Sequence, residues 1–147
     1  MFKKKIVHNK LVRDKIPDIL LDQGKAFKAC NHKFLGDRIK LLSSKLVEEA
    51  EEVEDKVYWF DHLSEVEPIS IDEEVAYQNA VTEELADVYE VFTTLSKLLG
   101  INQLDIEKVA AKKKEERGGF EKGVYLEWSF PLRLSQSGSL FPERFHA

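Results

Sequence analysis

Two stretches of the chain repeat an apolar residue at alternating steps of four and three positions. In the first stretch these positions are Leu35, Ile39, Leu42, Leu46, Glu49 and Val53. In the second stretch they are Tyr77, Val81, Glu84, Val88, Val91, Leu95 and Leu98. This spacing places each series on one face of a helix. Each series therefore predicts a core-facing helix in which one carboxylate, Glu49 or Glu84, takes the place of an apolar residue.

Start and stop signals predict two helices in the first half of the chain. Asp14 is suited to cap the first helix, Pro17 fits its first turn, and Gly24 ends it. The second helix is expected over about residues 37–60. The composition of residues 61–70, with a serine and a proline, predicts a break in the helical pattern.

Two further helices are expected in the second half. Ser70 and Glu73 have the spacing of a capping box, so the third helix begins there. This helix stops at Gly100, a residue type that commonly follows a helix. The fourth helix covers about residues 103–116, with Asn102 as its cap.

These patterns predict an all-α protein of four helices. Residues 5–7, and residues 124–128, which alternate in polarity, are expected as short extended segments or strands on its flanks. Residues 1–130 would form the domain. Residues 131–147, which are rich in serine, glycine, proline and arginine, would form a C-terminal tail.

Composition narrows the classes of function. The 147 residues suit one domain, and a net charge of -5 argues against a nucleic-acid-binding protein. A single cysteine, Cys30, excludes an internal disulfide framework and fits a reducing compartment. No apolar stretch approaches the ~20 residues of a membrane span. A cytoplasmic protein with no membrane partner is therefore expected.

The acidic residues of the two long helices indicate a site for a hard cation. Glu48 and Glu49 precede Glu52 by four and three residues, so all three can converge on one point, and Glu84 and Asp87 share a face of the next helix. Carboxylates that lie close together cannot all stay ionised without a cation between them. Their oxygen atoms favour Mg²⁺ or Mn²⁺ as that cation.

A second interpretation of the same residues stays open. Acid-rich helices often have a solvated acidic face, and here Lys45 and Lys56 would balance the charge. Glu49 argues against this interpretation because it lies on the apolar face of its helix.

Two basic segments are candidates for phosphate binding. Lys10, Arg13 and Lys15 precede the start of the first helix, where cations and backbone N–H groups together can bind an anion. Lys113 and Arg117 extend the apolar face of the fourth helix just before a pair of glycines. The alternatives are a solvated basic arm for the first segment and, for the second, cations that offset the helix dipole.

Four motifs in order resemble those of a known superfamily. They are residues 9–17 (NKLVRDKIP), Glu48-Glu49-x-x-Glu52, Glu84-x-x-Asp87 and residues 114–120 (KEERGGF). As a set they resemble the all-α nucleoside triphosphate pyrophosphohydrolases, which include the MazG-like proteins. The most similar branch is the one described as phosphoribosyl-ATP pyrophosphohydrolase-like. The resemblance covers about residues 5–127.

The resemblance implies a MazG-like four-helix core that assembles as a homodimer or a dimer of dimers. It also implies hydrolysis of a nucleoside triphosphate, or a phosphoribosyl-ATP-like molecule, to the monophosphate and pyrophosphate. The implied Mg²⁺ ligands are Glu48, Glu49, Glu52, Glu84 and Asp87. The chain departs from the pattern in the longer gap between its acidic motifs, caused by residues 61–70, and in the segment after Trp128.

Elementary chemistry agrees with such a reaction. The implied Mg²⁺ would offset the phosphate charge, helped by Lys10, Arg13, Lys15, Lys113 or Arg117. Glu48 or Glu49 would orient or deprotonate the attacking water, and the sequence does not decide which of them. Two other hypotheses compete: a nucleotide or metal sensor without turnover, and a structural helical dimerisation module whose acids pair with lysines.

Overall fold

The computed structural model describes residues 5–66 and 68–129 and is all-α. Its helices are α1 (Ile16–Asp22), α2 (Leu35–Val66), α3 (Ile71–Leu98) and α4 (Gln103–Arg117). The prediction of an all-α protein with four helices is therefore confirmed. Among the helices described, none is long and apolar enough to cross a membrane.

The predicted strands are wrong. Residues 5–7 and 124–128 belong to no strand, and the described parts of the chain contain none. A strand needs a partner to satisfy its backbone hydrogen bonds, and an alternating pattern alone does not supply one. Val124 and Leu126 are 83% and 75% exposed, so no other described element covers these two side chains.

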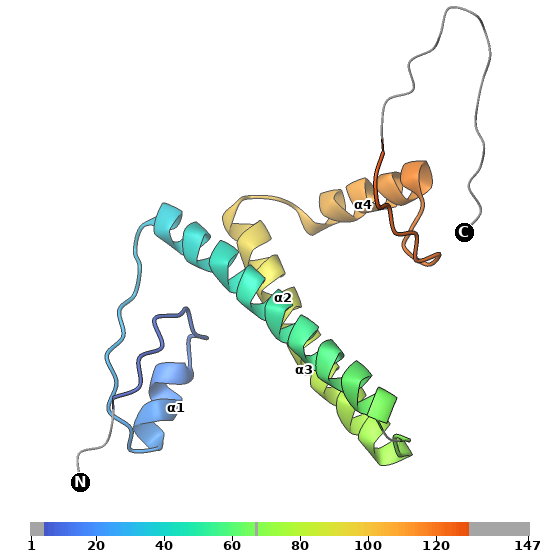
Figure 1. The fold of residues 1–147 in the computed structure, drawn as a ribbon. Helices are drawn as coiled ribbons and strands as arrows, with labels where there is room; N and C mark the ends of the chain where they lie inside the picture. Colours follow the sequence, from blue (N-terminus) through green and yellow to red (C-terminus); the bar gives the residue numbers. More distant parts are fainter. Residues whose placement is uncertain (1–4, 67, 130–147) are drawn as a thin grey trace, which may run out of the picture. The chain divides into compact units, whose positions relative to one another are not determined.

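The helices α2 and α3 form an antiparallel hairpin and lie side by side along most of their length (Figure 1). Leu42 of α2 and Val91 of α3 are buried where the helices meet. With the exception of Leu35, the residues of both predicted apolar series are buried or half-buried. The spacing thus identified the two faces that pack together.

The end of the hairpin lies further along the chain than expected. Helix α2 continues to Val66, so the predicted break is wrong for residues 61–66. Pro68 explains why the helix stops ahead of it, because a proline disfavours the helical conformation in the residue that precedes it. Near this end, the ring of Phe60 from α2 stacks on Tyr77 from α3, with centroids 3.6 Å apart.

Both ends of α3 are fixed by local hydrogen bonds. The Ser70 hydroxyl accepts a bond from the Glu73 backbone N–H at 3.3 Å, and the Glu73 carboxylate accepts one from the Ser70 N–H at 2.9 Å. The predicted capping box is therefore confirmed. At the other end, Gly100 has a φ of +69° and the Ile101 N–H donates to the Ser96 carbonyl at 2.9 Å.

The N-cap position of the short helix α1 lies one residue after the predicted cap. Lys15 occupies the N-cap position, and no side chain caps this helix, so the assignment of Asp14 was wrong. The predicted role of Pro17 in the first turn is confirmed. Gly24, with a φ of +65°, follows the end of the helix as expected.

Helix α4 has the predicted start. The Asn102 side-chain oxygen accepts a hydrogen bond from the Leu104 N–H at 2.9 Å, which confirms it as the cap. The chain divides into a first unit that ends at Val109 and a second that begins at Ala110, so the boundary lies within α4. The predicted tail, residues 131–147, lies outside the described residues.

Candidate functional site

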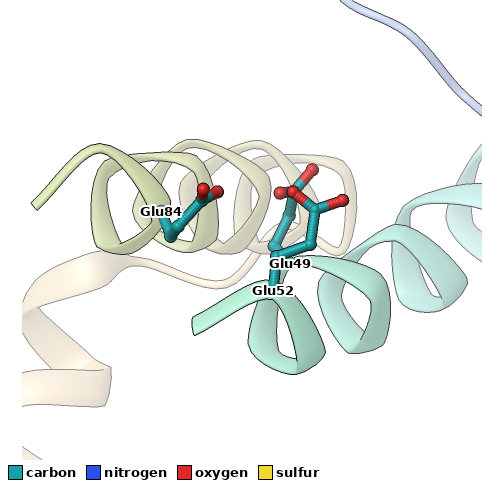
Figure 2. A group of neighbouring side chains, drawn as sticks. All are labelled: Glu49, Glu52 and Glu84. Atoms are coloured by element: carbon teal, nitrogen blue, oxygen red, sulfur yellow. The ribbon is translucent and has the colours of Figure 1, made fainter. Parts of the chain in front are cut away.

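Three carboxylates converge between the helices of the hairpin. Glu49 and Glu52 from α2 and Glu84 from α3 each offer an oxygen atom, and these atoms lie within 4.8 Å of one another. Figure 2 shows the three side chains with their carboxylates directed towards one another. Glu49 is only 4% exposed, and the other two are half-buried. We call these three residues the acidic cluster.

Lys45, which the second interpretation of the sequence assigns to balancing a solvated acidic face, lies beside the acidic cluster. The Lys45 amino group is 2.6 Å from Glu49 Oε1 and 2.9 Å from Glu48 Oε1, and its side chain is 15% exposed. Burial opposes the charge of Lys45, but the hydrogen bonds to both glutamates outweigh burial and raise its pKa. The signal was present in the sequence, since Lys45 precedes these acids by three and four residues.

The other two predicted metal ligands lie outside the acidic cluster and pair with basic residues near the N-terminus. Lys10 Nζ is 3.0 Å from Glu48 Oε1, and the Arg13 guanidinium forms an ion pair with Asp87. The hydrogen bond from Lys45 is the main reason that the pKa of Glu48 is lowered. The structure thus places all five predicted acids in the middle part of the two hairpin helices but divides them into two groups.

Glu52 differs from its neighbours in its electrostatics. Among the described residues, it is the one predicted ligand without an ion pair, while Lys56 lies 3.7 Å from Glu84. Burial raises the pKa of Glu52, and the charges of Glu49 and Glu84 raise it further. A divalent cation would relieve this repulsion, and carboxylate oxygens on two helices suit Mg²⁺ chemically. The residues present therefore fit the implied metal.

Replacing Glu52 by glutamine is expected to raise the melting temperature by about 1–4 °C near pH 7 without divalent cations. The raised pKa means that the charged form of Glu52 destabilises the folded protein above that pKa. This penalty fades as the pH falls towards the unfolded value of about 4.3, so the advantage of the variant should shrink there. Thermal unfolding at several pH values measures the effect.

Glu51→Gln is the matched control, because Glu51 is the exposed neighbour on the same helix. It removes the same charge away from the acidic cluster. A Glu52 variant that melts at or below the wild-type temperature at pH 7 would contradict the repulsion.

The remaining predicted site residues are basic and exposed. Lys15 lies at the start of α1, two residues after Arg13. Lys113 and Arg117 lie on the part of α4 that belongs to the second unit. Their predicted approach to a phosphate stays a prediction.

No protein-family model, no curated protein and no solved structure matches this chain. The candidate site is therefore argued from its own residues and geometry.

Proposed function

We propose that the protein is a cytoplasmic, Mg²⁺-dependent pyrophosphohydrolase of nucleoside triphosphates, related to the MazG-like enzymes. Its substrate would be a nucleoside triphosphate or a phosphoribosyl-ATP-like molecule, which it would hydrolyse to the monophosphate and pyrophosphate. The observation that carries this proposal is the convergence of Glu49, Glu52 and Glu84 from two helices. Lys10 and Arg13, which pair with the neighbouring acids Glu48 and Asp87, could bind the phosphate groups of the substrate.

In the proposed mechanism the acidic cluster would hold the metal. Glu48 and Asp87, which are near neighbours of Glu49 and Glu84 along the same helices, would complete its ligands. When bound, Mg²⁺ would offset the charge of the phosphate oxygens and polarise the attacking water. Lys10 and Arg13 would neutralise and orient the phosphate groups. Glu48 or Glu49 would orient or deprotonate the attacking water, and Lys45 lies 2.9 Å from the first and 2.6 Å from the second.

The proposed enzyme assembles from two or more copies through the hairpin. Leu85 of α3 and Leu99, the C-cap residue of this helix, are 52% and 48% exposed and belong to a second apolar row beside the packed face. In the part of the chain that the structure describes, Leu42 and Val91 are the only buried hydrophobic residues. A second hairpin against α2 and α3 would give the four-helix core that the resemblance implies.

The ion pairs also favour a second candidate function. Lys45 with Glu49 and Lys56 with Glu84 neutralise two acids of the acidic cluster by protein cations alone. In a structural helical dimerisation module, these two ion pairs would be enough to neutralise the acids. It would bind no divalent cation specifically and hydrolyse no nucleotide.

The test is a panel of ribonucleoside triphosphates, deoxynucleoside triphosphates and phosphoribosyl-ATP, assayed with Mg²⁺ for pyrophosphate and monophosphate. At least one member should give both products in equal amounts, and omission of Mg²⁺ should abolish the reaction. Diphosphate and orthophosphate as the main products would exclude cleavage between the α and β phosphates. Saturable Mg²⁺ binding without any turnover would instead indicate a sensor.

A further inference from the structure

The segment before α1 connects the two helices of the hairpin by ion pairs. Residues 5–15, which we call the basic arm, form no helix or strand and lead into α1 (Figure 1). Lys10 pairs with Glu48 on α2, and Arg13 pairs with Asp87 on α3. The basic arm therefore contacts one acid from each helix at the edge of the acidic cluster.

The backbone has a distinct conformation on each side of Lys10 and Arg13. Asn9 has a φ of +47°, a left-handed conformation that asparagine adopts more readily than most residues. Asn9 immediately precedes Lys10. Beyond Arg13 the chain is held by α1, because the Ile16 N–H donates to the Arg13 carbonyl at 3.0 Å. The two cations thus lie between a residue with a left-handed backbone and the start of a helix.

Both ion pairs are open to solvent and therefore exchangeable. The side chains of Lys10 and Arg13 are 42% and 61% exposed, and those of Glu48 and Asp87 are 30% and 37% exposed. Exposed pairs of this kind contribute little stability and weaken as salt rises. A stronger ligand for the same carboxylates would displace them.

We propose that the basic arm is a displaceable strap, in which Lys10 and Arg13 compete with a divalent cation for Glu48 and Asp87. A carboxylate oxygen that accepts a hydrogen bond from an arginine is less available to a metal. Binding of the cation would release the two basic side chains next to the site where phosphate groups arrive. This inference rests on the proposed function and adds an order of events to it.

Competition of this kind is reciprocal. If the basic arm weakens the affinity for the cation by some factor, the cation must weaken the attachment of the arm by the same factor. Removing the arm's charge should therefore tighten cation binding, and adding the cation should expose the arm. The two effects have different readouts and can be measured on the same protein.

The first measurement is a calorimetric titration of the full chain with Mn²⁺ alone at low ionic strength. Arg13→Gln is expected to bind Mn²⁺ about two- to fivefold more tightly than wild type, the range set by one exposed ion pair. Lys10→Gln should act in the same direction. Arg38→Gln is the matched control, since Arg38 is an exposed arginine at the start of α2, and its affinity should equal that of wild type.

The second measurement is limited trypsin digestion with and without Mn²⁺. Trypsin needs an accessible basic side chain, so cleavage after Lys10 and Arg13 should become faster when Mn²⁺ binds, whereas cleavage after Arg38 should not change. Unchanged cleavage, equal Mn²⁺ affinities of wild type and Arg13→Gln, or no Mn²⁺ binding at all would each overturn the strap. Pyrophosphate release, assayed separately, decides the proposed function.

Discussion

Glu84→Gln is expected to lower kcat/KM for pyrophosphate release by about 10²- to 10³-fold, a loss typical of removing one charged contact from a catalytic centre. Glu84 is the contribution of α3 to the acidic cluster, and the other two members belong to α2. The amide has nearly the same shape but no negative charge, so it binds Mg²⁺ poorly. The affinity for Mg²⁺ should therefore fall together with the activity, which calorimetry and a pyrophosphate assay measure side by side.

The chain offers a close control for this variant. Glu83→Gln removes the same charge from the next residue of α3, which is exposed. Its activity and Mg²⁺ affinity should stay within about twofold of wild type, because the change lies outside the acidic cluster. If Glu84→Gln keeps full activity, or if both variants lose it equally, the acidic cluster is not the metal site.

Lys45→Met is expected to lower the free energy of unfolding by about 1–3 kcal/mol in the absence of divalent cations. Methionine keeps most of the aliphatic length of lysine but leaves the carboxylate of Glu49, only 4% exposed, without its cation. An uncompensated buried charge is strongly destabilising. Urea denaturation of both proteins, followed by circular dichroism, measures the difference.

Two further variants separate the ion pair from general effects of the substitution. Lys40→Met makes the same change at an exposed position of α2 and should leave stability almost unaltered. Adding Glu49→Gln to Lys45→Met should restore most of the lost stability, because it removes the stranded charge. A double variant that is as unstable as Lys45→Met would show that packing, and not charge, accounts for the loss.

Much of the hairpin could be predicted because its signals are local. The alternation of three and four steps requires only that the residues form one helix, and the capping box of Ser70 lies within four residues. The position of Glu49 on the apolar face followed from the same spacing, and burial confirmed it. Local patterns therefore defined which faces meet and which acid would be buried.

Other features depend on contacts between distant residues. Lys10 and Glu48 are 38 positions apart, and Arg13 and Asp87 are 74 apart, so no local pattern could pair them. The end of α2 was misjudged for a different, local reason. Ser64 and Pro68 predicted a break over residues 61–70, but a single serine weakens a helix only slightly, and the helix continues to Val66.

The extension of α2 to Val66 has a consequence for how such a chain can change in length. An antiparallel pair of helices can be lengthened at its connecting turn by adding residues to both helices. The residues farther from the turn keep their orientation. The number of residues between Glu52 and Glu84 is therefore free to vary in evolution. One residue inserted nearer to either glutamate would instead turn the helix by about 100° and direct that carboxylate elsewhere. Relatives should tolerate insertions and deletions at the tip of the hairpin and reject them beside the acids.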